Sequence, residues 1–269
     1  MERHPVVAGR FYDADPELLC SVVDGFLNMA GEKREAPTRL AMVPHAGYVY
    51  SGAVCGTTLG MANLAPTILL LGPNHTGLGD SFSLWGDGNW HIPGASLSVD
   101  VELAEALLMA VPLLRADRRA HQQEHSIEVI LPFLHRLNPR TTIVPITIAS
   151  SSLDVLRRTG QAIGQVLASF DRSVSIVVSS DMSHYIAHDV AKAQDALALN
   201  ALDVSDPAAL FETVRGNDIS MCGVLPMTTG MFAVAEMGAT HVEVVSYATS
   251  GEVSGDFDQV VGYAGVLVS

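Results

Sequence analysis

The sequence predicts a single layered α/β/α domain with a mainly parallel central sheet, covering residues 1–269. Apolar runs alternate with helical patterns along the chain, which is typical of a sheet covered by helices on both faces. Runs such as Ile68–Leu71 are apolar at every position, as strands buried on both faces are. No linker, low-complexity run or internal repeat divides the sequence, which favours one domain.

Six apolar runs are expected to form strands. Pro145 lies inside the third of them and cannot donate a main-chain hydrogen bond, so it predicts an edge strand or a bulge. The six runs are Leu40–Val43, Thr67–Leu71, Thr141–Ile148, Val174–Ser179, Val242–Ser246 and Val260–Val268.

Seven segments between these runs have helical patterns. In one of them, Ile127, Ile130 and Leu134 recur at the spacing that places them on one helical face. Ser126 precedes this helix and is the expected N-cap, because a serine hydroxyl accepts a bond from an exposed main-chain N–H. The expected helices are Pro16–Met29, Gly52–Ala62, Val101–Val111, Ile127–Leu137, Leu153–Phe170, Val190–Leu202 and Val224–Met237.

The composition indicates a chain that is largely buried and weakly charged. Hydrophobic residues make up 48% and charged residues 16% of the sequence, against about 25% charged in an average globular protein. This excludes intrinsic disorder, which requires low hydrophobicity and high charge.

No apolar run reaches the roughly 18 residues needed to cross a bilayer, and the charged first residues lack the apolar core of a signal peptide. We therefore expect a cytoplasmic protein.

The charge balance excludes two classes of partner. The 15 lysines and arginines against 29 aspartates and glutamates give a net charge of −14 with neutral histidines. Binding to nucleic acid or to an anionic membrane surface requires clustered basic residues, and the sequence contains no such cluster. Cys20, Cys55 and Cys222 form no CxxC pair, which indicates reduced thiols rather than a disulfide scaffold.

Three histidines occupy the same topological position. His45, His75 and His184 each follow one of the predicted strands after a short turn. In open α/β sheets, ligands bind outside the carboxyl ends of the strands. If the three strands are parallel neighbours, the three imidazoles meet at one crevice. Pro44 and Pro73 end two of the strands and fix the backbone there, which suits a metal site.

A metal site with two histidines needs a further, anionic ligand. Asp181, Glu124 and Cys222 are the candidates by context. Cys222 lies just before a predicted helix, and a helix N-terminus lowers the pKa of a thiol and favours the metal-binding thiolate. Cys20 and Cys55 fall within amphipathic helices, where thiols are usually small buried apolar groups. Position therefore favours Cys222, and an inert buried thiol is the alternative.

Residues 121–125 read His-Gln-Gln-Glu-His, which matches the zinc signature of an inverted metallopeptidase. That chemistry requires both histidines on one face of a helix. The expected N-cap at Ser126 places the pattern before the helix, and a chain with 10 histidines produces such a pattern readily by chance. The motif is therefore weak support for a peptidase.

Six short stretches follow one another from the N-terminus to beyond residue 220. They are Ala8–Tyr12 (AGRFY), Pro44–Tyr48 (PHAGY), Leu71–His75 (LGPNH), Glu124–Glu128 (EHSIE), Val178–Asp181 (VSSD) with His184, and Cys222–Gly223. Together they resemble the Memo family, which includes the prokaryotic proteins called AmmeMemoRadiSam system protein B. The resemblance covers nearly the whole chain, and the ordered set is highly specific although each stretch is short.

The resemblance implies a fold similar to that of class III extradiol dioxygenases, the non-haem iron enzymes that open catechol rings. It also implies metal ligands at His45, His75 and Cys222, an acid/base histidine at His184 and a further pocket residue at Asp181. Iron, copper and a redox role are associated with the family. Its prokaryotic name reflects a genomic association with radical-SAM and AMMECR-type proteins, and animal members are described as binding phosphotyrosine peptides.

One departure bears on the chemistry. Extradiol dioxygenases bind iron through two histidines and a carboxylate. A thiolate in the third place is softer and shifts the preference toward Cu(I), zinc or a more electron-rich iron. A redox metal can therefore be expected in this chain, whereas the ring-cleaving activity of the dioxygenases is put in doubt. Phe11 and Tyr12 stand where animal members have Trp-Tyr, so peptide binding is not transferred.

The sequence therefore predicts a metal-dependent oxidoreductase with a dioxygenase-like fold and one metal ion, iron first and copper or zinc otherwise. His184 is the expected general acid/base, tuned by Asp181. Two alternatives stay open. One is a module that binds a peptide or protein through an enzyme-like pocket that no longer catalyses a reaction, and the other is a zinc hydrolase with metal-bound water as nucleophile. The substrate is a small molecule or a peptide. The expected pocket or supporting residues are Glu124, His125, Tyr48 and Asn74.

Overall fold

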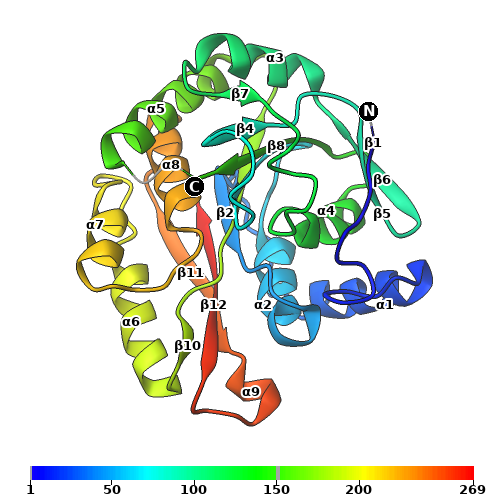
Figure 1. Ribbon diagram of the computed structural model, residues 1–269, viewed down its shortest axis with the longest axis vertical. Coiled ribbons are helices and arrows are strands. Elements are labelled where there is room, and N and C mark those ends of the chain that lie inside the picture. Colours follow the sequence, from blue (N-terminus) through cyan, green and yellow to red (C-terminus); the bar gives the residue numbers. More distant parts are fainter. Residues whose placement is uncertain (1, 150–151) are drawn as a thin grey trace.

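The computed structural model describes residues 2–149 and 152–269 and places a mixed sheet between two layers of helices (Figure 1). The expected layered α/β/α fold is confirmed. The strands are β1 (Glu2–Arg3), β2 (Leu40–Val43), β3 (Thr67–Pro73), β4 (Phe82–Leu84), β5 (Asn89–Ile92), β6 (Ala95–Val99), β7 (Arg115–Ala116), β8 (Thr142–Ile148), β9 (Val174–Ser179), β10 (His184–Ile186), β11 (Val242–Thr249) and β12 (Val260–Val268). The helices are α1 (Pro16–Leu27), α2 (Tyr48–Met61), α3 (Val101–Ala110), α4 (Leu131–Leu137), α5 (Leu153–Ser169), α6 (His188–Asn200), α7 (Ala209–Gly216), α8 (Val224–Glu236) and α9 (Gly251–Ser254), with a 3-10 turn η1 (Glu128–Ile130).

The middle of the sheet is parallel, as predicted. The strands lie in the order β8-β3-β9-β2-β12, and β8, β3, β9 and β2 all run in one direction. β12 is antiparallel to β2 and carries β10 and β11 as further antiparallel neighbours. The strands that precede His45, His75 and His184 are therefore direct neighbours, so their carboxyl ends lie side by side.

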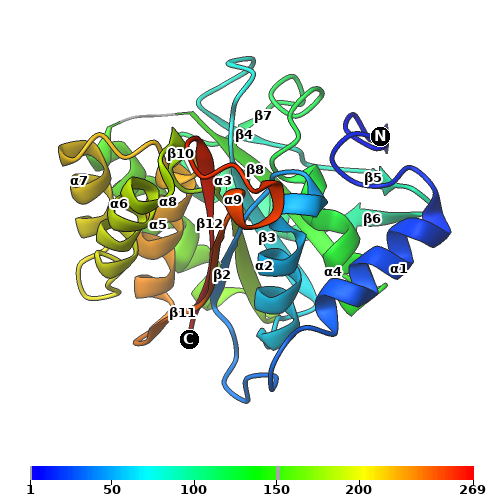
Figure 2. The same cartoon turned by 90° about the horizontal axis from the view of Figure 1, so that it is seen from below.

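Helices cover both faces of this sheet. Figure 2 shows α1, α2 and α4 on one side and α5 to α8 on the other. α2 packs on β2 and β12, α8 packs on β3 and β9, and α3 joins the second layer through α5. Among the described residues, no helix combines the length and the apolar character that crossing a membrane requires.

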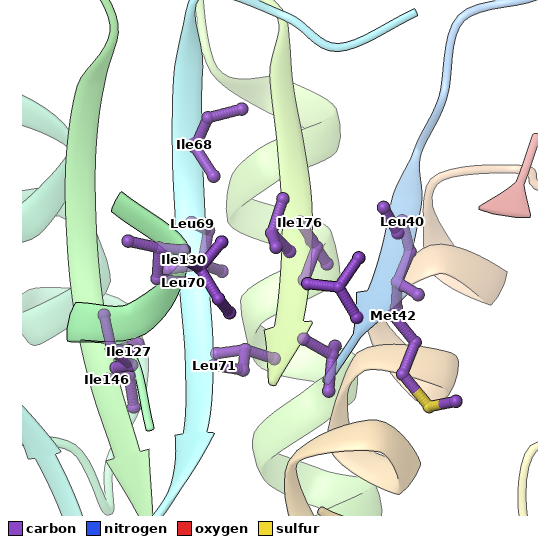
Figure 3. Close-up of a cluster of buried hydrophobic side chains, with 14 of the residues drawn as sticks. Leu40, Met42, Ile68, Leu69, Leu70, Leu71, Ile127, Ile130, Ile146 and Ile176 are labelled. Atoms are coloured by element: carbon purple, nitrogen blue, oxygen red, sulfur yellow. The ribbon is translucent and has the colours of Figure 1, made fainter. Parts of the chain in front are cut away.

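The central strands are apolar because both of their faces are covered. All residues of β3 are buried, and Leu69, Leu70 and Leu71 are completely inaccessible to solvent. Figure 3 shows these side chains with Ile176 and Met42 from the neighbouring strands. A fully buried leucine or isoleucine contributes roughly 1.5–3 kcal/mol to stability. The cluster therefore fixes the strands whose ends carry the candidate site.

β8 is an interior strand, so the edge strand predicted from Pro145 was wrong. β3 pairs with β8 along its whole length on one side. On the other side, β6 pairs with residues 142–143 and β4 with residues 146–148. Pro145 lies between these two short partners, where no main-chain N–H is required for pairing.

The N-cap predicted at Ser126 was also wrong. The helix begins as η1 at Glu128, and its N-cap residue is Ile127. The hydroxyl of Ser126 instead donates to the carbonyl oxygen of Pro73 at 2.9 Å. This bond ties the loop before η1 to the end of β3, next to His75.

Candidate metal centre

The carboxyl ends of β2, β3 and β9 bring several polar side chains to one place. His45 lies two residues beyond β2 and His75 two residues beyond β3, and their ring centroids are 5.3 Å apart. Asp181 lies two residues beyond β9 and accepts the main-chain N–H of His45 at 2.8 Å. His184 lines the same cavity. The structure thus brings together the three histidines that follow the predicted strands.

A third imidazole completes a close group. His125 comes from the loop before η1, and its ring centroid lies 5.5 Å from that of His45 and 5.0 Å from that of His75. One nitrogen of each ring lies within 4.8 Å of the other two. Sequence reasoning proposed His125 as a supporting residue, whereas the geometry makes it a candidate ligand as well.

The hydrogen bonds of His45 direct its Nε2 atom toward Cys222, whose Sγ lies 3.6 Å away. Nδ1 lies 2.5 Å from the hydroxyl oxygen of Ser179, which itself donates to the carbonyl oxygen of Ser126 at 2.6 Å. Because that bond uses the one hydroxyl proton of Ser179, the hydroxyl accepts from His45, and Nδ1 carries the imidazole proton. The lone pair on Nε2 is therefore available to a metal ion.

Glu124 orients His75 in a similar way. Its Oε1 accepts from Nδ1 of His75 at 2.9 Å and lies 3.4 Å from Nδ1 of His125. The carboxylate also accepts the main-chain N–H groups of His75, His125 and Ser126 at 2.5, 2.9 and 3.0 Å. Burial by itself raises the pKa of Glu124, but these bonds, that from His75 first, lower the pKa to about 2.

Two of the three imidazoles are held in the neutral form. Burial lowers the pKa of His45 well below its usual value, and His75 and His125 lower it further. Burial also lowers the pKa of His125, although Glu124 opposes the shift. At His75, burial lowers the pKa, but the bond and charge of Glu124 outweigh it and raise the pKa overall. Neutral imidazole is the form that binds metal ions, so His45 and His125 fit a metal ion as they stand, and at His75 a metal ion would compete with a proton.

Cys222 lies beside His45, two residues before α8 begins at Val224. Its Sγ is 3.6 Å from Nε2 of His45 and accepts the main-chain N–H of Asp181 at 3.3 Å. The sequence predicts a lowered thiol pKa at this helix terminus. The structure shows the reverse, because burial and then the carboxylate of Asp181 raise the pKa of Cys222. A metal ion would have to displace the thiol proton in order to bind sulfur.

Asp181 and His184 flank the imidazoles. Oδ2 of Asp181 lies 3.9 Å from Nε2 of His45, and burial raises the pKa of this carboxyl. Nδ1 of His184 lies 2.9 Å from the carbonyl oxygen of Ser220. A carbonyl oxygen only accepts, so Nδ1 carries the proton and Nε2 is left to accept a proton in the cavity.

The three imidazoles, Asp181 and His184 line one open cavity of about 510 Å³, whereas Glu124 and Cys222 lie behind its described lining. This volume lies within the range of small-molecule sites. The lining includes the three imidazoles, Asp181 and His184, and it continues over aromatic residues and over the segment between residues 250 and 263. The cavity therefore gives an organic molecule access to the three imidazoles.

Three residues that the sequence associates with this chemistry lie elsewhere. Tyr48 is buried, and its hydroxyl donates to a main-chain carbonyl oxygen at 2.8 Å. Asn74 shapes the turn after β3, where its amide bonds the main chain of residues 76–78. His121 is completely buried and bonds the carbonyl oxygen of Ser83 at 3.0 Å, so the H-x-x-E-H pattern is divided between the core and the site. None of the three lines the cavity.

An N-terminal clamp, made of Arg3, Tyr12 and Glu128, holds the loop that carries Glu124 and His125. Arg3 is 3% exposed and donates from Nη2 to the carbonyl oxygen of Glu124 at 2.6 Å. Its Nη1 pairs with the buried carboxylate of Glu128, which also accepts the hydroxyl of Tyr12 at 2.7 Å. The loop thereby gains a fixed position although it has no regular secondary structure of its own.

Sequence reasoning assigned no role to Ser179 or to Arg3. A signal for Ser179 exists, because it ends a strand that is adjacent to the strand before His45. Arg3 has no such signal, since it lies 121 residues from Glu124 in the chain.

Comparisons with known proteins agree with the motifs. A family model described as Memo-like protein matches residues 3–267. A MEMO1 family protein of Methanopyrus kandleri is 40% identical and one of Aquifex aeolicus 37% identical, covering 99% and 98% of both chains respectively. The crystal structure of protein JW3007 from Escherichia coli K12 shares the fold, with a TM-score of 0.57, 12% identity, and coverage of 85% of this chain and 99% of that one. This chain therefore belongs to the Memo family.

Proposed function

We propose that the chain binds one redox-active metal ion through His45, His75 and Cys222 and oxidises a small organic substrate. The observation that carries this proposal is the fixed tautomer of His45 and His75, since Ser179 and Glu124 occupy the two Nδ1 atoms. Hydrogen bonds of this kind support most metal-bound histidines. The family resemblance points to the same three ligands.

The sulfur of Cys222 narrows the choice of metal. Thiolate is a soft ligand, and together with imidazole it favours copper, zinc or electron-rich iron over magnesium and calcium. Iron is the first expectation because the resemblance extends to non-haem iron dioxygenases, and copper is the second. When bound, either metal supplies the one-electron and O₂ chemistry that protein side chains lack.

The chain itself supplies proton transfer and orientation. His184 lines the cavity and presents Nε2 as the nitrogen that is left to accept a proton from a substrate. Asp181 holds the main chain of His45 through Oδ1 and donates its own main-chain N–H to Cys222. It thereby connects a donor after β2 with a donor before α8.

A zinc hydrolase is the second candidate, and His125 is the observation that favours it. Three imidazoles with nitrogens within 4.8 Å of one another match the three-histidine set of some catalytic zinc sites. Zinc in such a site supplies an activated water as nucleophile. A module that binds a peptide or protein is the remaining alternative, and it requires the cavity without a metal.

Metal analysis of protein purified without oxygen separates these functions. We expect about one iron or copper ion per folded chain, because the proposed ligands form a single site. Zinc alone contradicts the redox proposal and supports the hydrolase. A folded protein that retains and takes up no metal contradicts both and supports the binding module.

We further propose a functional link with a radical-SAM protein and an AMMECR-type protein. The support is the name of the prokaryotic family members, which reflects this association. Affinity purification of the tagged chain from its native cells is expected to recover one or both. Recovery of neither, with and without cross-linking, contradicts a stable complex.

A further inference from the structure

Four aromatic side chains line the cavity beside the imidazoles: Phe11, Tyr50, Tyr185 and Tyr263. They come from the N-terminal segment, α2, β10 and β12, so four separate parts of the chain contribute. Tyr50 is 41% and Tyr185 72% exposed. Exposed rings that gather around a cavity are typical of ligand sites, because a ring in the core is covered by its neighbours.

Tyr185 has a backbone conformation that bulky residues avoid. Its φ is 56°, in the left-handed region. It lies between His184 and Ile186, where the pairing of β10 with β12 shifts in register. Irregularities of this kind re-aim side chains and are frequent beside functional sites. The strain and the exposure together point to a binding role for this ring.

Tyr263 is 2% exposed, and its hydroxyl, which bonds no described residue, is not one of the fully buried polar atoms that lack a partner. The hydroxyl therefore reaches solvent while the ring is covered, and a tyrosine placed in this way offers a ligand a polar contact. Tyr263 lines the cavity, so a ligand there can replace water as the partner of this hydroxyl.

The lining has carboxylates but no permanent positive charge. Asp181 and Asp256 line the cavity, and no lysine or arginine is found among its described lining residues. Asp256 belongs to the segment between α9 and β12, which Figure 1 shows beside β10. His75 is paired with Glu124 at 2.9 Å.

Phosphates and carboxylates are bound by arginine, lysine or free helix N-termini. Gly47, the N-cap residue of α2, lines the cavity, but the main-chain N–H groups of Tyr48, Tyr50 and Ser51 already donate to the carbonyl oxygens of Phe11 and Gly47. The protein part of this cavity therefore offers few donors to an anion.

We propose that this cavity binds an organic cation, an amine carried on a flat apolar body, and discriminates against carboxylates and phosphates. The ammonium group contacts Asp256 and the faces of Tyr50 and Tyr185, because cations are attracted to aromatic faces. The hydroxyl of Tyr263 hydrogen-bonds the ligand. The inference rests on the proposed function in placing this ligand next to the metal centre, and it names the substrate class for that site.

Three probes with the same phenylethyl body test the charge preference. Phenethylamine is a cation, phenethyl alcohol is neutral, and hydrocinnamate is an anion. We expect calorimetric titration of the metal-free protein to show phenethylamine binding about tenfold more tightly than hydrocinnamate, with the alcohol between them. Metal-free protein is used so that the charge of a metal ion does not attract the carboxylate.

Matched variants locate the preference within the cavity. Asp256→Asn is expected to weaken phenethylamine binding by about threefold to tenfold and to leave the alcohol unchanged. Asp258→Asn is the control, because Asp258 is exposed, lies two residues further along and does not line the cavity. It should bind all three probes as the unaltered protein does.

Equal or tighter binding of hydrocinnamate overturns the inference, and so does an Asp256→Asn variant with unchanged affinity for phenethylamine. These failures are distinct from failure of the proposed function. A protein that takes up iron or copper but prefers the anion keeps the metal centre and refutes the ligand class. A protein that takes up no metal but prefers the amine refutes the metal centre and keeps the ligand class.

Discussion

At the scale of single residues, hydrogen bonds orient the candidate ligands before any metal is present. Ser179 and Glu124 accept the Nδ1 protons of His45 and His75, and both acceptors are buried. Rings held in this way lose little further freedom when a metal binds. Removing one acceptor should therefore weaken metal binding more than it weakens the fold.

Glu124→Gln tests this expectation. The amide keeps the volume but replaces one acceptor oxygen by a donor, next to several N–H groups that need acceptors. We expect the metal affinity to fall by about 10- to 100-fold, as for other groups that support metal-bound histidines. Titration of the metal-free protein with Zn²⁺ measures it. Glu212→Gln, at an exposed position of α7, is the control, and an equal affinity in both variants would show that Glu124 does not position the ligands.

Tyr185→Gly should raise stability and lower ligand binding. Glycine adopts a φ of 56° without strain, and the lost ring is 72% exposed, so little packing is removed. We expect the free energy of unfolding in urea to rise by about 0.5–1 kcal/mol, while phenethylamine binds more weakly. Tyr185→Phe keeps the strain and the ring and should change neither quantity strongly. A Tyr185→Gly variant less stable than the unaltered protein would show that the conformation is not strained.

At the scale of elements, prediction from sequence was most accurate where burial is complete. β2, β9 and β12 occupy the predicted residues, because an uninterrupted apolar run defines a strand covered on both faces. The short strands β4 to β7 and β10 and the helix α7 were not predicted. β4, β7 and β10 pair with strands that are distant in the chain, so their sequences alone do not define them. β5 and β6 form a hairpin of short strands, and α7 has only 8 residues, so none of the three is long enough to show a clear period.

Some residues of the candidate site could also be predicted from the sequence, and others could not. His45, His75 and Asp181 were predictable because each lies two residues beyond a parallel strand. The approach of His125 was not, since its loop is held by the N-terminal clamp. Spacing also could not separate Tyr48 from Tyr50, because α2 begins at Tyr48, which turns the first ring into the core and leaves the second at the cavity.

Arg3→Met tests the N-terminal clamp. The variant leaves the carboxylate of Glu128 buried without its cation, and breaking a buried pair costs about 3–5 kcal/mol. We expect this loss of stability in urea unfolding, together with weaker Zn²⁺ binding, because Arg3 also holds the carbonyl oxygen of Glu124. Arg10→Met changes an exposed arginine of the same segment and is the control. A loss below about 1 kcal/mol would place the clamp among ordinary surface ion pairs.

At the scale of the whole molecule, the buried His121 couples folding to pH. Burial lowers its pKa to about 4, although the bond to Ser83 opposes the shift. The unfolded chain has the ordinary value of about 6.5, so between these values the unfolded state binds a proton that the folded state does not. This contribution to stability is present above about pH 6.5 and is lost as the pH falls toward 4, up to about 3 kcal/mol.

Urea unfolding of the metal-free protein between pH 7 and pH 4 measures this loss, and His121→Gln should show a smaller decline because it removes the titrating group. The exposed His241→Gln is the control and should follow the unaltered protein. The same decline in His121→Gln would assign the acid sensitivity to other groups.

The order of the strands in the sheet determines which candidate metal ligands lie close together. His45 and His75 follow parallel strands of the central sheet. Cys222 lies just before α8, and His125 lies in the loop before η1. The structure brings the three imidazole nitrogens within 4.8 Å of one another, and the sulfur of Cys222 lies 3.6 Å from Nε2 of His45, so two sets of metal ligands can be proposed. One contains the sulfur of Cys222, as we propose, and the other contains three imidazoles.

Titration of the metal-free protein with Co²⁺ tests this choice most directly, because bound thiolate gives a sulfur-to-cobalt charge-transfer band. We predict that the band saturates at about one equivalent and is absent from Cys222→Ser, which should still fold. Co²⁺ binding without this band in the unaltered protein would contradict the proposal. The metal would then lie among His45, His75 and His125 without Cys222.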